Sequence, residues 1–380
     1  MRAASQRFML VRMKLRYRIL GGFLGLVVIA VVALAIVLGH TSPCEPPPSI
    51  ESGVETMKAN RYRCYGSADV VEFTDVEVPK PASNEVLVRV RAAAVNPLDW
   101  HYMRGAPYLV RLGSGIGKPK DTRMGVDFAG VVAAVGPDVT RFKPGDEVFG
   151  GRNGAFAEFV VVPEDRAITL KPESVTFEQA ATVPIAALTA LQALRDPGQM
   201  QPGDKVLING ASGGVGTFAV QIAKAMGAEE VHGVCSTRNV EMVRSLGADR
   251  VFDYKQENYT ESDNKYDLIV DMVGNHSLSA NRRVLQPEGR LVMVGGDKGN
   301  WIAPLIGPIK AMLMSPFVSQ ELSIILARLR ADDLVVVADL MSDGAVTPVI
   351  DREFALEDVA DAIRYSETGR ARGKILVRID

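Results

Sequence analysis

A glycine-rich run follows a short apolar segment, Lys205 to Ile208, in the second half of the chain. It leads into a stretch of helical periodicity, Val215 to Met226, which Gly227 ends. A strand that turns through glycines into a helix directs backbone N–H groups at a diphosphate and leaves room for its close approach. The pattern therefore predicts a dinucleotide-binding loop. Its residues are Gly210, Ala211, Ser212, Gly213, Gly214, Val215 and Gly216.

The next predicted strand, Val231 to Cys235, indicates which dinucleotide is bound. An NAD-preferring site usually has an acidic residue about 20 residues beyond the glycines, where it binds the ribose 2′-hydroxyl. Here the strand ends in Ser236 and Arg238 instead. A hydroxyl and a guanidinium suit a 2′-phosphate, because arginine binds phosphate in a fixed two-pronged geometry. The sequence favours NADPH over NADH; alternatively, Arg238 is simply solvated at the start of a helix.

The length, charge and cysteine content of the chain limit its possible class. With 380 residues, the chain is long enough for two domains with sizeable cores. The net charge of −2 conceals a basic N-terminus, because residues 1–18 carry six positive side chains and no acid. The rest has no basic patch that would indicate nucleic-acid binding. Three scattered cysteines, Cys44, Cys64 and Cys235, predict neither a disulfide framework nor a zinc cluster.

The basic N-terminus precedes an apolar stretch, residues 19–39, of 21 residues without a charge. This length crosses a hydrocarbon core of about 30 Å as a helix. It predicts a single-pass membrane anchor with a cytoplasmic N-terminus and residues 40–380 on the far side; the alternative is a buried globular helix. Free NADPH is cytosolic, so the side of the catalytic domain stays uncertain. Either the charge rule fails, or a soluble form starts at Met57, or the enzyme works outside on something else.

The remaining chain divides into several regions of different character. Residues 40–56 are rich in proline and predict an extended linker. Residues 58–184 predict a β-rich domain, and strands alternate with helices over 206–294, which predicts a parallel doubly wound sheet. A last strand, Lys374 to Ile379, is expected to return to the β-rich domain. The unusually apolar residues 301–329 fit a substrate pocket, a bilayer contact, a dimer interface or a core helix.

Several motifs together resemble the medium-chain dehydrogenase/reductase superfamily, in its zinc-independent quinone oxidoreductase branch. Besides the glycine loop and Ser236–Arg238, they are Val95-Asn96-Pro97-Leu98-Asp99, Gly125-Val126-Asp127-Phe128-Ala129-Gly130, Phe142-Lys143-Pro144-Gly145-Asp146-Glu147-Val148 and Ala180-Ala181-Thr182-Val183-Pro184. The resemblance covers roughly residues 57–380. It implies an α/β fold with a GroES-like β-rich catalytic domain, a doubly wound Rossmann NADP-binding domain, and a homodimer. With the N-terminal segments, the expected divisions are 1–18, 19–39, 40–56, 57–184 with 330–380, and 185–329.

The same motifs depart from the zinc-using alcohol dehydrogenases of this superfamily. Asn96 stands where those enzymes have a first cysteine ligand, and Val126-Asp127 replaces their His-Glu. Zinc needs three or four N, S or O ligands, so we expect no metal. Without a Lewis acid, hydride transfer suits an acceptor that delocalises charge. We therefore expect an NADPH-dependent oxidoreductase that reduces quinones or α,β-unsaturated carbonyls.

By resemblance, Asn96 and Thr189 approach the nicotinamide, and His101 occupies a position where relatives often carry tyrosine. His101 or Tyr102 is expected to hydrogen-bond the substrate oxygen or to supply a proton; alternatively, both only pack around the cofactor amide. Asp99 is expected to order its loop. Further cofactor contacts are expected at Gly274 and Gly295, which follow predicted strands.

A second functional class remains open. An anchored dinucleotide-binding scaffold or sensor would keep the fold with little catalysis. The intact glycines, Asn96 and Thr189 favour an enzyme, whereas the doubtful compartment favours the scaffold. A zinc-type alcohol dehydrogenase is a third interpretation, which the missing ligands weaken.

Overall fold

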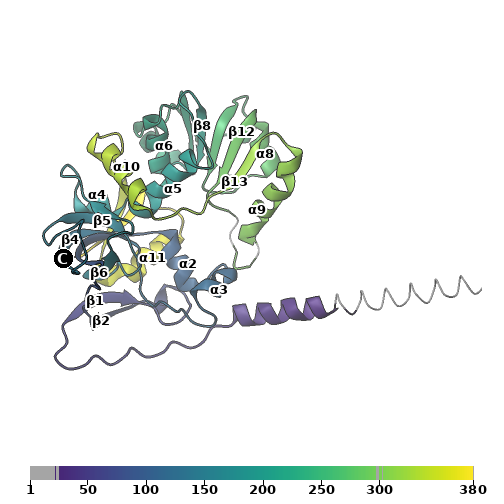
Figure 1. Cartoon of the computed structure of the whole chain (residues 1–380). Coiled ribbons are helices and arrows are strands. Elements are labelled where there is room, and N and C mark those ends of the chain that lie inside the picture. Colours follow the sequence, from purple (N-terminus) through teal and green to yellow (C-terminus); the bar gives the residue numbers. More distant parts are fainter. Residues whose placement is uncertain (1–21, 23–24, 297–298, 302, 380) are drawn as a thin grey trace, which may run out of the picture.

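The computed structural model describes residues 22, 25–296, 299–301 and 303–379 (Figure 1). Within them the chain folds around two large sheets and a small two-stranded one. The strands are β1 (Thr56–Arg61), β2 (Glu72–Glu77), β3 (Glu85–Val95), β4 (Asp127–Val135), β5 (Glu147–Gly151), β6 (Phe159–Pro163), β7 (Ile168–Leu170), β8 (Lys205–Asn209), β9 (Glu230–Cys235), β10 (Arg250–Asp253), β11 (Tyr266–Asp271), β12 (Leu285–Met293), β13 (Glu321–Ile324), β14 (Ile350–Ala355) and β15 (Lys374–Arg378).

The described helices connect these strands or cover the sheets. Besides short 3-10 turns and an N-terminal helix at residues 25–39, they are α2 (Pro97–Arg104), α3 (Arg111–Ser114), α4 (Phe177–Ala181), α5 (Pro184–Arg195), α6 (Gly214–Ala225), α7 (Val240–Ser245), α8 (Leu278–Arg283), α9 (Ala303–Met314), α10 (Ala331–Ser342) and α11 (Val359–Glu367).

The six-stranded sheet has the order β10-β9-β8-β11-β12-β13, and every neighbouring pair is parallel. The chain moves outward from β8 through β9 to β10 and then crosses back to β11 on the other side of β8. The strand order therefore reverses between β8 and β11, where open α/β sheets bind their ligands at the carboxyl ends of the strands. This sheet confirms the predicted doubly wound domain.

The other large sheet is the β-rich domain, in the order β14-β15-β3-β4-β5-β7, with β6 also paired to β3. β15 runs antiparallel to β3, with Ile375 opposite Val95. The last strand thus returns to the N-terminal β domain, as the sequence predicts. This return brings Lys374 beside the loop that follows β3.

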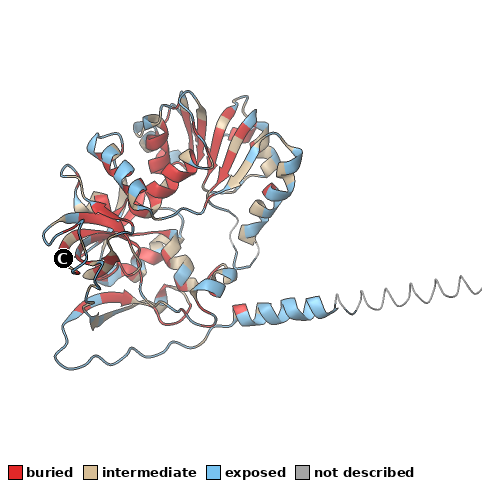
Figure 2. Cartoon of the chain, viewed as in Figure 1, coloured by how far each residue is buried: buried red, intermediate tan, exposed pale blue. Residues whose placement is uncertain are grey.

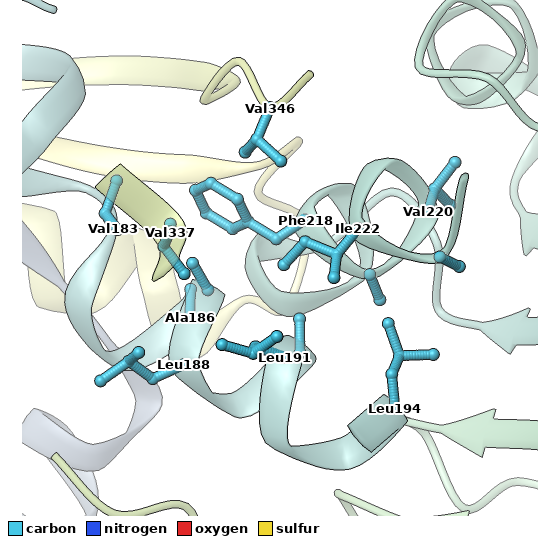
Figure 3. Packing of buried hydrophobic residues seen from close by; sticks show 14 of the residues in the cluster. Val183, Ala186, Leu188, Leu191, Leu194, Phe218, Val220, Ile222, Val337 and Val346 are labelled. Carbon is cyan, nitrogen blue, oxygen red and sulfur yellow. The ribbon is translucent and has the colours of Figure 1, made fainter. Parts of the chain in front are cut away.

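A shared apolar core joins the helices between the two sheets. Figure 3 shows side chains of α5, α6 and α10 packed together, among them Leu191, Phe218 and Val337. All three are almost fully buried. Burying a large apolar side chain stabilises a fold by about 1.5–3 kcal/mol, so this cluster keeps α6 and the loop before it in a defined position.

The N-terminal helix, residues 25–39, projects from the body beside α3 (Figure 1). Most of its apolar side chains are exposed, whereas Ala35 is half-buried and Leu38, at its end, is buried (Figure 2). No helix within the described residues has the length and apolar character needed to cross a membrane. The expected spanning helix at 19–39 is therefore not found in the described part of the chain, and residues 19–21 and 23–24 lie outside it. The predicted domain boundaries stay predictions.

Two sequence-based interpretations need correction. Cys44 and Cys64 form a disulfide, although their spacing gave no reason to pair them, because folding returns the linker to the start of the β-rich domain. The apolar segment after residue 300 is not a core helix. In α9 only Ala311 is buried, and Phe317 and Leu326 are 86% and 89% exposed.

Candidate functional site

The glycine loop lies between β8 and α6, at the point where the strand order reverses. α6 begins at Gly214, one residue before the predicted start. A Cβ atom on Gly216 would lie 2.2 Å from the Gly210 carbonyl oxygen, so only glycine allows the loop to fold back onto the helix. The first N–H groups of α6 have no acceptor within the helix. They form a ready anion-binding site.

The end of β9 brings the predicted 2′-phosphate residues to the same loop. The Asn239 side chain donates to the Ser212 hydroxyl at 2.9 Å and to the Ser236 hydroxyl at 3.3 Å. Arg238 is exposed and donates to the backbone carbonyl of Arg370 at 2.6 Å. Asn239 therefore joins Ser212 to Ser236, and Arg238 follows two residues after Ser236; their role in binding a 2′-phosphate stays a prediction. Arg370, from the other domain, was missed because nothing in the sequence links it to β9.

Tyr254 is a second residue that the sequence analysis missed. It follows β10, its N–H donates to the Cys235 carbonyl at 3.1 Å, and its side chain is 58% exposed. Tyr254 therefore presents an exposed aromatic side chain from a backbone position next to the end of β9. The parallel pairing of β10 with β9 was the signal that could have located it.

The strand order reverses between β8 and β11, and on the β11 side Asp271, the last residue of that strand, organises the following loop. One Asp271 oxygen accepts from Asn209 at 2.8 Å and from the N–H groups of Val273 and Gly274 at 3.0 and 2.9 Å. A Cβ atom on Gly295 would lie 2.1 Å from the Met272 carbonyl oxygen. Gly274 and Gly295 thus line the same sheet edge as the glycine loop, where they were predicted.

A buried polar cluster lies on the β-domain side of the site. The Asn96 amide donates to Asp127 at 2.9 Å, and Lys374 Nζ donates to Asn96 at 2.5 Å and to Asp127 at 3.3 Å. All three residues are at least 97% buried. Burial raises the pKa of Asp127, and Lys374 opposes that rise. Lys374, which the sequence analysis missed, therefore compensates a buried carboxylate and orients Asn96.

The same cluster connects the two domains. The other Asp127 oxygen accepts from the Ile185 N–H at 3.0 Å, and Thr189 donates to the Ile185 carbonyl at 2.6 Å. Lys374 also lies against the glycine loop, since a Cβ atom on Gly214 would be 3.1 Å from its Cδ. The structure therefore brings Asn96, Thr189 and the phosphate loop into one neighbourhood through Lys374 and Asp127. The Asn96 amide nitrogen donates to Asp127 and its oxygen accepts from Lys374, so Asn96 links these two residues.

Helix α2 carries the proposed proton-handling residues. Asp99 accepts from the Asn96 N–H at 2.7 Å in a capping box, which confirms that it orders the loop. Complete burial raises the pKa of Asp99 to about 7. Tyr102, next to His101, is 42% exposed.

His101 has a defined protonation pattern. Its Nδ1 lies 2.8 Å from the Ala106 carbonyl oxygen, which can only accept a hydrogen bond, so Nδ1 carries the proton. Burial lowers the His101 pKa, which keeps the ring neutral near pH 7. Its Nε2 is then an acceptor, and it becomes a donor only when acid protonates the ring.

Metal ligands do not gather at this site. Across residues 22, 25–296, 299–301 and 303–379, no group of three or more His, Cys, Asp or Glu side chains is arranged to hold a metal ion. Asn96, which the resemblance aligns with a first cysteine ligand of zinc enzymes, and Asp127 both accept from Lys374 instead. The absence of zinc stays a prediction.

Comparison with known proteins shows the family. Residues 82–172 match the alcohol dehydrogenase GroES-like domain, and residues 246–377 match the family described as zinc-binding dehydrogenase. The chain is 36% identical over 340 residues to the chloroplast envelope quinone oxidoreductase homolog of Arabidopsis thaliana, covering 84% of this chain and 98% of that protein. It is 33% identical over 341 residues to the 2-methylene-furan-3-one reductase of Solanum lycopersicum, covering 84% and 79%.

A solved structure agrees with these sequence relatives. The quinone oxidoreductase from Coxiella burnetii superposes with a TM-score of 0.75 at 28% identity, over 86% of this chain and 100% of that one. Another relative, an NADPH-dependent alkenal/one oxidoreductase of Arabidopsis thaliana, is 32% identical over 335 residues, covering 84% and 79%. The chain therefore belongs to the medium-chain dehydrogenase/reductase superfamily and is an NAD(P)H-dependent reductase related to its quinone and enone reductases.

Proposed function

We propose that this protein uses NADPH, without zinc, to reduce a quinone or an α,β-unsaturated carbonyl compound. The observation that best supports this proposal is the position of Lys374. Its side chain lies against the glycine loop at Gly214 and donates to Asn96, so it joins the two parts of the candidate site. The names of the relatives, which include quinone oxidoreductases and an alkenal/one oxidoreductase, support the substrate class.

The residues around the loop fit a dinucleotide. The N–H groups at the start of α6 suit a diphosphate, and Ser236 with Arg238 suits a 2′-phosphate. Arg372 lies next to Gly373, whose N–H donates to the Ser212 carbonyl at 2.9 Å, and the buried Arg372 Nε has no partner. A phosphate group would supply that missing acceptor.

When bound, reduced nicotinamide supplies the hydride, and the protein orients the reactants and handles the proton. We place the nicotinamide beside Asn96 and Thr189, as the family resemblance implies. The neutral His101 offers its Nε2 as an acceptor, and the more exposed Tyr102 offers a hydroxyl donor. We propose that the Tyr102 hydroxyl, or a water that donates its other proton to His101 Nε2, donates to the substrate oxygen and supplies its proton.

Steady-state kinetics test the proposal. The full chain is assayed for NADPH oxidation with a panel of quinones, enals and simple aldehydes, and His101→Phe and Tyr102→Phe are compared with it. We expect turnover with quinones or enals, and a fall of about tenfold in kcat for each variant, the usual range for acid–base groups. Full activity in both variants would remove their role. NADPH binding without turnover on any acceptor would support the scaffold alternative.

We also propose that the N-terminal segment attaches the protein to a membrane, with the catalytic domain on the far side from the N-terminus. The exposed apolar side chains of residues 25–37 and the six positive charges before residue 19 support this orientation. The Cys44–Cys64 disulfide supports it as well, because disulfides persist in oxidising compartments.

Protease protection in intact cells tests the sidedness. Digestion of the catalytic domain from outside would support the proposal, and protection until the cells are lysed would contradict it. The homodimer implied by the family resemblance stays a prediction, which analytical ultracentrifugation in detergent would measure.

A further inference from the structure

A hollow of about 670 Å³ lies away from the glycine loop, between the proline-rich linker and the β-rich domain. Pro46 and Pro48 of the linker line one side, and Arg61, Arg63, Lys118 and Lys120 line the other. None of these residues belongs to the candidate functional site. These four cationic side chains make the hollow basic, although the net charge of the whole chain is negative.

The linker side of this hollow is fixed in place. The disulfide from Cys44 to Cys64 ties the linker to the segment after β1. The Ser42 N–H donates to the Gly117 carbonyl at 2.8 Å, and Lys118 pairs with Glu45. The hollow is therefore a built feature of the folded chain, with covalent and hydrogen-bonded support on its linker side.

The charges in the hollow are only partly compensated. Arg63 pairs with Glu72 and Lys118 with Glu45. Among the described residues, Arg61 and Lys120 form no salt bridge, since the nearby Asp121 pairs with Arg123, and the Arg61 side chain donates to the Asn60 carbonyl. Burial, and next the charges of Arg123 and Arg63, lower the pKa of Arg61 to about 10, and the Asp121 carboxylate only partly opposes them. A partly buried cation among other cations is costly unless an anion accompanies it.

We propose that this hollow binds a phosphate-bearing anion through Arg61 and Lys120. Arginine offers a two-pronged donor set for phosphate oxygens, and lysine adds a mobile point charge. The phosphate comes from a free organophosphate or from the headgroup of an anionic phospholipid. The hollow adjoins the linker, and Arg111 holds the carbonyls of Leu38 and His40 just before it, so a headgroup near the N-terminal helix is within reach.

Isothermal titration of the full chain in a non-ionic detergent tests the site. The probes are inorganic phosphate, glycerol phosphate, dihexanoyl-phosphatidylglycerol and dihexanoyl-phosphatidylcholine. Arg61→Gln/Lys120→Gln removes both cations, and Arg166→Gln/Lys80→Gln is the control, since it removes two exposed cations elsewhere on the β-rich domain. We expect the double variant to bind the best phosphate probe about tenfold more weakly, and the control to bind like the parent chain.

The pattern among probes identifies the source of the phosphate. Tighter binding of dihexanoyl-phosphatidylglycerol than of glycerol phosphate assigns a lipid headgroup, and the reverse order assigns a free organophosphate; both support the site. NADPH titration should be unchanged in both double variants, so a failure here is distinct from a failure of the proposed function. Binding that is equal in the parent and in Arg61→Gln/Lys120→Gln, or no binding of any probe, would overturn the proposal. Circular dichroism confirms that each variant is folded.

Discussion

The guanidinium of Arg111 donates to the Leu38 carbonyl at 2.9 Å, so a buried side chain of the catalytic domain closes the end of the N-terminal helix. The same group donates to the carbonyls of His40 and Gly105, each at 2.8 Å. Gly105 is the C-cap of α2, the helix that carries His101. A cation at a helix C-terminus interacts favourably with the helix dipole. Arg111 therefore connects the N-terminal helix to the helix of the candidate site.

Replacing this arginine should destabilise the catalytic domain. Arg111 is 2% exposed and lies between the rings of Tyr65 and Tyr108, 4.4 and 4.5 Å from their centroids. We expect Arg111→Gln to lower the free energy of unfolding by about 3 kcal/mol, because several buried carbonyls lose a charged donor. Chemical denaturation measures the change, and Arg166→Gln, at an exposed site, is the control. Equal stability of the two variants would mean that Arg111 contributes little.

Asp99 should make stability depend on pH. Its pKa rises to about 7 in the folded chain from an ordinary value of 3.8, so between these values the folded state binds the proton more tightly than the unfolded state. This stabilisation is complete below about pH 4 and is lost as the pH rises through 7, by about 1.4 kcal/mol per pH unit at the steepest point. We expect Asp99→Asn, which keeps an acceptor for the Asn96 N–H, to flatten the curve. An unchanged slope in denaturation across pH 4 to 8 would refute the assignment.

Lys374 should contribute to the stability of the fold mainly by compensating the buried charge of Asp127. Lys374→Met leaves a buried carboxylate without its cation, and we expect a loss of about 3–5 kcal/mol in unfolding free energy. Adding Asp127→Asn removes that charge, so the double variant should recover part of the loss. Denaturation of the single variants and the double variant measures this coupling. Strictly additive losses would contradict it.

Arg238 should discriminate between the two cofactors. Its guanidinium is exposed beside Ser236 and Arg370. We expect Arg238→Gln to raise the KM for NADPH about tenfold, because a charge-assisted contact to the 2′-phosphate is lost, and to leave the KM for NADH unchanged. Parallel steady-state titrations with both cofactors measure the effect. Equal changes for the two would show that Arg238 does not bind the 2′-phosphate.

The three cysteines should fall into two groups in their reaction with a thiol reagent. We expect one thiol, Cys235, in the denatured unreduced chain and three after reduction, because Cys44 and Cys64 are paired. In the folded chain Cys235 should react slowly, since burial raises its pKa to about 11. Maleimide labelling followed by mass spectrometry gives the counts. Three reactive thiols without reduction would show that the disulfide does not form.

Much of the fold follows from local patterns. The glycines after β8 and the alternation of strands and helices determine a doubly wound sheet, because turn geometry and hydrophobic periodicity act over a few residues. The same reasoning located Ser236, Gly274 and Gly295, since the ends of parallel strands meet at one sheet edge. The return of the last strand to the N-terminal β domain also followed from its position after the α/β region, whereas its pairing with β3 is seen only in the structure.

Contacts across long stretches of chain were decided by the tertiary structure alone. Lys374 lies 278 residues from Asn96 in sequence, and no local pattern indicates that the two side chains meet. The pairing of Cys44 with Cys64, the approach of Arg370 to Arg238 and the unpaired charge of Arg61 are of the same kind. By itself the sequence determined the elements and the phosphate loop, because those depend on neighbouring residues. The partners of each buried charge depend on packing between distant segments, so only the folded chain decides them.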